Sequence, residues 1–278
     1  MGADAEVYVF DDRAYLAQVV PLFRRLLQHG LGHPALNEVL DRLRPGVGAI
    51  LRYIGKELRG LEPADLDAYC TYLGDDLRLL TPPADLAEKL AGHGDEWDDR
   101  ACHREGCPAS ARCPFFIEDH ARRADPLSLL FQSVVRVVCL GESQFVGRSF
   151  HVFDYAPVLQ KNAVPWDGEL GRLLAALGMR GAVVGYGFGD TEGIHGWLSH
   201  EETGRLAGLL ASIPLPSLEP SFEAMRRTRS PGEGYHVDGW EWEELSLGFV
   251  RTVAVMASGS GKGLLWGNDV SNVLDLLA

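Results

Sequence analysis

Residues 92–125 constrain the fold of this chain more than any other segment, because they combine clustered cysteines with little material for a core. Cys102, Cys107 and Cys113 lie within twelve residues. The stretch that precedes them, from Gly92, is polar, and the segment closes at Asp125-Pro. Ordering such a segment costs conformational entropy that its few apolar side chains do not offset. We therefore expect an internal cross-link that involves these cysteines.

A disulfide framework is a poor explanation for this cluster. The chain has five cysteines, an odd number, and its N-terminus is acidic and lacks the apolar core of a secretory signal. These features predict a cytoplasmic protein whose thiols stay reduced. A metal ion is then the expected cross-link.

The ligand types and their spacing favour structural zinc. Zinc is held tetrahedrally by thiolate and imidazole ligands, and the pattern C-x4-C-x5-C supplies three thiolates. We expect the four ligands to be Cys102, Cys107, Cys113 and His120. Other candidates for the fourth ligand are His93, His103, Cys70 and Cys139. The C-x2-C pair of the strongest zinc motifs is missing, so unligated thiols, an iron–sulfur cluster that recruits Cys139, and a disulfide stay open.

Composition narrows the class of partner. The chain has 278 residues, of which 46% are apolar, enough for one large domain or two ordinary ones. No apolar run approaches the roughly eighteen residues of a membrane helix. The formal net charge of −13 argues against nucleic-acid binding, which depends on neutralising phosphates, and the arginines around the cysteines leave too small a local excess to change this. A basic protein is the partner that an acidic surface favours.

Hydrophobic periodicity and chain breakers predict an α+β protein in three parts. Residues 1–91 form a helix-rich region with an N-terminal strand at 5–10, after which Asp11 or Asp12 caps a helix over 13–28 that Pro21 kinks or breaks. Residues 92–125 are the Cys-rich, zinc-stapled connector. Residues 126–278 form a mixed α/β domain.

Several elements are expected within this third part. An apolar helix is expected over 127–140 and a buried strand over 181–188. Ser199 and Glu202 form a capping box that starts a helix running to about residue 212. A polar loop over 217–239 is expected to precede an amphipathic helix over 242–257 and a returning strand at 263–266.

Two glycine-rich segments resemble phosphate loops without satisfying their requirements. The segment from Gly185 to Gly193 carries Asp190 and Glu192, which repel anions, so a tight surface loop is the better interpretation. The segment Ser258–Gly263 lacks the glycine and the Ser or Thr that a Walker motif places around its lysine, and it is expected to connect a helix to a strand rather than the reverse.

The histidines of the third part suggest an alternative, enzymatic function. Such a group can build a metal-dependent hydrolase site, although no H-E-x-x-H spacing is present. The residues are His195, His200 and His236, with Asp190, Glu192, Glu201, Glu202 and Asp238. Surface histidines are the simpler interpretation of the same residues.

Short motifs in the third part resemble the YfbM-like family of uncharacterised bacterial proteins. They are Asp125-Pro-Leu, Leu140-Gly-Glu, Gly185-Tyr-Gly and Leu198-Ser-His-Glu-Glu, and the resemblance covers residues 125–270. It implies a compact α+β domain and no particular activity. The helix-rich first part and the cysteine cluster depart from the family's pattern.

The sequence therefore predicts a cytoplasmic, bacterial-type α+β protein with a structural zinc site and no assigned catalytic residue. Its expected function is non-catalytic: binding of a basic protein, as a regulator or an immunity-type inhibitor. The alternative is a metal-dependent hydrolase or small-molecule enzyme that uses the C-terminal histidines and carboxylates.

Overall fold

A computed structural model describes residues 4–19, 21–22, 132, 134–179, 193–228 and 239–270. The predicted zinc ligands Cys102, Cys107, Cys113 and His120 lie outside these residues. So do the two expected domain boundaries, at 91/92 and 125/126, and the expected strand over 181–188. Among the described residues, no helix has the length and apolar character needed to cross a membrane.

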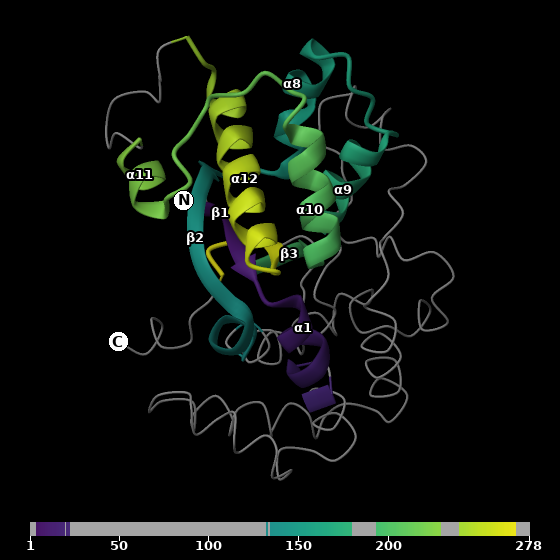
Figure 1. Cartoon of the computed structure of the whole chain (residues 1–278), viewed down its shortest axis with the longest axis vertical. Helices are drawn as coiled ribbons and strands as arrows, with labels where there is room; N and C mark the ends of the chain where they lie inside the picture. Colours follow the sequence, from purple (N-terminus) through teal and green to yellow (C-terminus); the bar gives the residue numbers. More distant parts are fainter. Residues whose placement is uncertain are drawn as a thin grey trace, which may run out of the picture.

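The described part is an α+β fold, as predicted, and it is built on one antiparallel sheet. The sheet has the order β2-β1-β4-β3, from β1 (Asp4–Phe10), β2 (Leu140–Arg148), β3 (Gly193–Leu198) and β4 (Gly263–Asn268). Strand β1 lies in the interior of this sheet, between two strands that follow it by well over a hundred residues (Figure 1). The N-terminal strand of the first predicted part thus shares a sheet with the third part.

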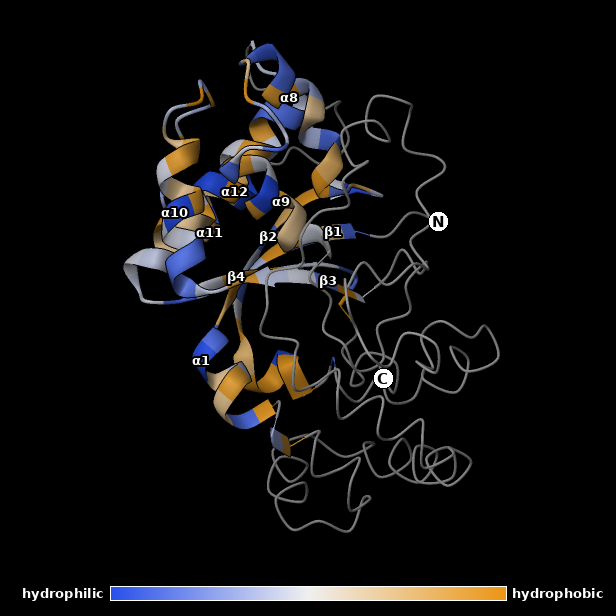
Figure 2. Ribbon diagram, turned by 90° about the vertical axis from the view of Figure 1, so that its right-hand side faces the viewer, coloured by the Kyte–Doolittle hydropathy of each residue, from blue (hydrophilic) through white to orange (hydrophobic). Residues whose placement is uncertain are grey.

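The long helices pack on one face of the sheet. Figure 2 shows α9 (Glu169–Met179), α10 (His200–Leu210) and α12 (Trp242–Gly259) on this first face, whereas the short helix α1 (Asp12–Ala14) lies below the sheet, beyond the end of β1. The first face carries the large core, in which Trp266 and Phe249 are almost fully buried. A cluster of three aromatic rings lies beside the end of β1: Phe10, Tyr15 and Trp197, with centroids 5.5 to 5.6 Å apart.

Shorter elements complete the helical side. They are the 3-10 turn η2 (Val152–Tyr155), α8 (Ala156–Lys161) and α11 (Phe222–Arg227). A buried hydroxyl fastens α12 to this layer: Ser246 Oγ donates to the Val146 carbonyl at 2.6 Å and lies 2.8 Å from the Tyr155 hydroxyl. Because both partners are buried, this contact fixes the position of α12 relative to β2 and η2.

Most of the predicted elements that can be compared are confirmed. The N-terminal strand is β1, and Asp11 caps α1 by accepting from the Ala14 N–H at 2.9 Å. The chain then forms a π-helical turn (η1, Tyr15–Val19), a local departure from the regular helix expected over 13–28, and Pro21 and Leu22 are helical. The capping box of Ser199 and Glu202 begins α10. The amphipathic helix and returning strand are α12 and β4, and the Ser258–Gly263 turn does connect helix to strand.

Two expectations are wrong in detail. The predicted loop over 217–239 contains α11, because the Ser221 hydroxyl accepts from the Ala224 N–H and Phe222 and Met225 anchor the helix in the core. The helix predicted over 127–140 ends at Cys139, and Leu140 begins β2. This strand is irregular, with register shifts against β1, so its sequence lacks the alternation by which strands are recognised.

Candidate functional site

Strand order brings several polar residues to one edge of the sheet. Strands β1 and β3 both run antiparallel to β4, so they point in the same direction and end at the same edge. Phe10 pairs with Gly263 and Leu198 with Leu264, which places both strand ends beside the start of β4. The residues that follow the two strands, from Asp11 and from Ser199, therefore meet.

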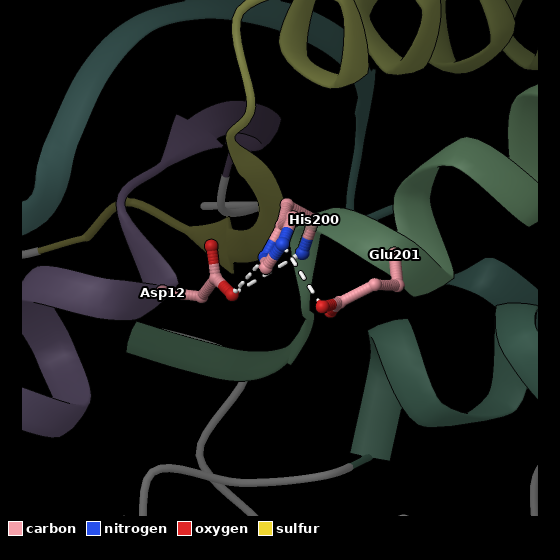
Figure 3. Close-up of side chains that lie close together, drawn as sticks. All are labelled: Asp12, His200 and Glu201. Atoms are coloured by element: carbon pink, nitrogen blue, oxygen red, sulfur yellow. Dashed lines mark hydrogen bonds and ion pairs between the residues drawn. The ribbon is translucent and has the colours of Figure 1, made fainter.

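Four of these residues form what we call the strand-end cluster: Asp12, Arg13, His200 and Glu201. Asp12 Oδ2 lies 2.9 Å from His200 Nδ1 and accepts from the His200 backbone N–H at 3.2 Å. On the other side of the ring, Nε2 lies 2.9 Å from Glu201 Oε1 and 2.8 Å from Arg13 Nη2. Figure 3 shows the imidazole between the two carboxylates.

Asp12 is the buried member of the cluster. Its side chain is only 3% exposed, and Oδ1 has no hydrogen-bond partner in the described part of the chain. A buried polar atom left unsatisfied costs about 1–3 kcal/mol. The carboxylate also lies at the N-terminus of α10, where the helix dipole stabilises negative charge. Asp12 thus links the end of β1 to the start of α10 while carrying an unsatisfied oxygen.

The three side chains around the His200 ring place conflicting requirements on the hydrogen bonds of its two nitrogen atoms. Asp12 accepts, so Nδ1 carries a proton. If the ring is neutral, Nε2 is a bare acceptor that suits Arg13 but faces the Glu201 oxygen without a proton between them. If the ring is charged, Nε2 donates to Glu201 but confronts the Arg13 guanidinium. No protonation state satisfies all three neighbours.

Asp11 and Glu202, which lie next to the strand-end cluster, are engaged in hydrogen bonds of the fold itself. Lys262 Nζ donates to Asp11 Oδ2. Burial alone would raise the pKa of Asp11, but the hydrogen bonds from Lys262 and from Ala14 outweigh it and lower that pKa. Glu202 is committed to the capping box, since its carboxylate accepts from the Ser199 N–H at 2.9 Å.

The carboxylate of Glu201 is accessible to a ligand, in contrast to that of Glu202. Its side chain is 70% exposed, and hydrogen bonds from its own backbone N–H and from the Ser199 hydroxyl lower its pKa. It is an accessible carboxylate that favours the charged form.

The rings of His195 and His151 contact one another. The His195 ring packs edge-on against His151 at 5.6 Å, and His151 stacks on Phe153 at 4.7 Å. Burial, with a smaller contribution from His195, lowers the pKa of His151 to about 3, so this ring is neutral at physiological pH.

The predicted histidine–carboxylate site is therefore only partly comparable with the structure. His200 and Glu201 are brought together, whereas His195 faces His151 and Glu202 serves as a cap. His236, Asp190, Glu192 and Asp238 lie outside the described residues. Asp12 and Arg13, which the sequence suggested only as a helix start, complete the cluster. The sequence signal that could have identified them is that charged residues directly follow two of the strands.

Cys139, one of the alternative metal ligands, is a buried free thiol. Burial and the nearby charge of Asp11 raise its pKa, so it stays protonated and unreactive.

Ligand-atom geometry identifies the chemistry that the strand-end cluster supports. Asp12, His200 and Glu201 each offer one ligand atom, and these atoms all lie within 4.8 Å of one another. Imidazole and carboxylate are the donors preferred by divalent ions such as zinc, manganese and iron. Comparison with known proteins found no matching family model, no similar curated protein and no similar solved structure.

Proposed function

We propose that the strand-end cluster binds a divalent transition-metal ion and that the protein is a metal-dependent hydrolase or related small-molecule enzyme. The observation that carries this proposal is the close approach of two ligand atoms, His200 Nε2 and Glu201 Oε1, in a cluster where Asp12 Oδ2 lies 2.9 Å from His200 Nδ1. This is the enzymatic alternative suggested by the sequence, with Asp12 as an added participant.

A metal ion would resolve the hydrogen-bond conflict at His200. An ion held by Nε2 and Glu201 Oε1 places positive charge between two acceptors that now lie 2.9 Å apart. Asp12 would then hold Nδ1–H, in the carboxylate–histidine–metal arrangement that fixes the tautomer and orientation of a ligand imidazole.

The small number of protein ligands at this site favours a catalytic metal ion over a structural one. Structural zinc sites are closed by four protein ligands, whereas catalytic sites keep positions for water and substrate. Glu201, being mostly exposed, places such positions at the surface edge of the sheet. There the ion would lower the pKa of a bound water and polarise a substrate oxygen.

Cobalt binding tests this proposal. We would titrate Co²⁺ into a chain carrying Cys107→Ser, so that the cysteine cluster does not compete, and follow the visible absorption of the ion. One ion per chain, without thiolate charge-transfer absorption, is the expected result. Glu201→Gln is expected to weaken binding about tenfold or more, in line with the loss of a contact to a charged group.

Glu169→Gln is the matched control for this titration. Glu169 is also an exposed carboxylate in the first turn of a helix, but it pairs with Arg205. Equal cobalt affinity in the Cys107→Ser parent and in its Glu201→Gln and Glu169→Gln variants would contradict the proposal.

A helix-rich region over residues 1–91 followed by a zinc-stapled connector over residues 92–125 stays a separate proposal. It predicts about one zinc per chain, lost together with thermal stability in Cys107→Ser. Such a site agrees with a cytoplasmic, reducing location.

Binding of a basic protein is the second candidate function, and the net charge of −13 favours it. It predicts that a pull-down at low salt recovers a basic partner that high salt releases. Recovery of no partner at low salt would argue against it.

A further inference from the structure

Arg13 donates to the same nitrogen that the proposed metal ion would take. Its Nη2 lies 2.8 Å from His200 Nε2. An arginine side chain is a permanent cation with donors only, so this contact uses the lone pair of Nε2. Metal ligation uses that lone pair as well. Ligation by the ion and the Arg13–His200 hydrogen bond therefore exclude one another.

If the metal ion displaced Arg13 from His200 Nε2, the guanidinium group of Arg13 would stay beside the ion. Arg13 directly follows Asp12 in the chain, and Asp12 is fixed by its two contacts to His200. The backbone thus keeps Arg13 at the cluster after its hydrogen bond is lost. The carboxylates of Asp12 and Glu201 offset the charge of a divalent ion, so among these groups the guanidinium charge is left without a counterion.

An oxyanion fits this arrangement better than a neutral group. Guanidinium binds carboxylate and phosphate oxygens through two parallel hydrogen bonds, and an anion between two positive charges is attracted by both. Lys262, the other cation near the cluster among the described residues, is held by Asp11. Within this described part of the chain, Arg13 is thus the cation at the cluster that metal binding would leave for a ligand.

We infer that Arg13 is a substrate-binding residue and that the substrate carries an oxyanion, a phosphate or a carboxylate, that bridges Arg13 and the metal ion. This inference rests on the proposed function. It assigns Arg13 to substrate recognition rather than to metal ligation, and the two roles are separable by experiment.

The test is cobalt and anion titration of the full chain carrying Cys107→Ser, with and without Arg13→Gln. Inorganic phosphate and acetate are the two probes, read from the change in the visible spectrum of bound Co²⁺. Arg205→Gln is the matched control, since Arg205 is an exposed arginine that pairs with Glu169 away from the cluster. Circular dichroism melting checks that each variant is folded.

Arg13→Gln is expected to bind Co²⁺ at least as tightly as the parent, because a competitor for Nε2 is removed. Its affinity for the preferred anion is expected to fall about tenfold, as for the loss of a charge-assisted hydrogen bond, while Arg205→Gln leaves it unchanged. Tighter binding of phosphate than acetate would identify a phosphorylated substrate, and the reverse a carboxylate.

Two results would overturn the inference in different ways. If Co²⁺ binds and the anion binds equally well with and without Arg13, the metal site stands and the role of Arg13 is wrong. If the parent chain binds no Co²⁺, the proposed function and the inference both fail.

Discussion

Replacing His151 by glutamine is expected to reduce the loss of stability that the protein suffers in mild acid. The His151 Nδ1 atom is buried without a hydrogen-bond partner among the described residues, and the ring stacks on Phe153. Burial lowers the pKa of this imidazole from 6.5 to about 3. Glutamine occupies similar space and does not titrate.

The sign and size of the effect follow from proton linkage. The unfolded chain protonates this histidine below its ordinary pKa, whereas the folded chain does not until the pH approaches 3. The contribution of His151 to the free energy of unfolding is therefore fully present above about pH 6.5 and is lost as the pH falls. Between about pH 7.5 and about pH 5.5 the expected loss from this residue is at most about 1.4 kcal/mol.

Urea denaturation at the two pH values measures this difference. Any pH-independent cost of losing the ring cancels when each protein is compared with itself. The wild type should lose more stability than His151→Gln on going to the lower pH. Phe153→Leu is the matched control, because it removes the stacking partner and keeps the titrating ring. If His151→Gln and the wild type show equal pH dependence, the assignment of a neutral His151 ring is wrong.

Three other substitutions probe the strand-end cluster and the sheet by thermal or urea denaturation. Asp12→Ala should destabilise the protein by about 1–2 kcal/mol through loss of a helix-terminal acceptor, and Asp12→Asn by less; equal stability of both with the wild type would contradict this. Gly263→Ala should destabilise strongly, because its Cβ would lie 2.1 Å from the Leu198 carbonyl oxygen; an unchanged melting temperature would show that β3 and β4 separate easily. Ser246→Ala should cost about 1–3 kcal/mol by leaving the Tyr155 hydroxyl without this partner; a loss below about 0.5 kcal/mol would mean that the hydroxyl finds another partner.

The sequence predicted those elements that carry strong local signals. The Ser199 capping box, the amphipathic periodicity of 242–257 and the β-branched strand at 5–10 each depend on residues close together in the chain, and all three are present. Strands β2 and β3 and helices α8, α9 and α11 were missed. Two of them depend visibly on tertiary contacts: β2 pairs irregularly with β1, and α11 is anchored by two buried side chains.

The candidate site was only half predictable for the same reason. His200 and Glu201 stood out as part of a histidine–carboxylate group. Asp12 and Arg13 looked like an ordinary helix start, because nothing local reveals that β1 ends beside β3. That proximity depends on β4 lying between the two strands. The cysteine cluster, whose signal is purely local, stays a prediction.

The interior position of β1 has a consequence for how the protein is made. Phe10 pairs with Gly263 on one side of β1 and with Leu140 on the other, so β1 leaves the ribosome long before either neighbour exists. Its two edges stay open during that time, and closing so long a loop is slow. Because β3 joins the sheet through β4, the sheet is completed only when residues 263–268 arrive. Until then the nascent chain exposes unpaired strand edges, the kind of surface that chaperones cover and that aggregation exploits.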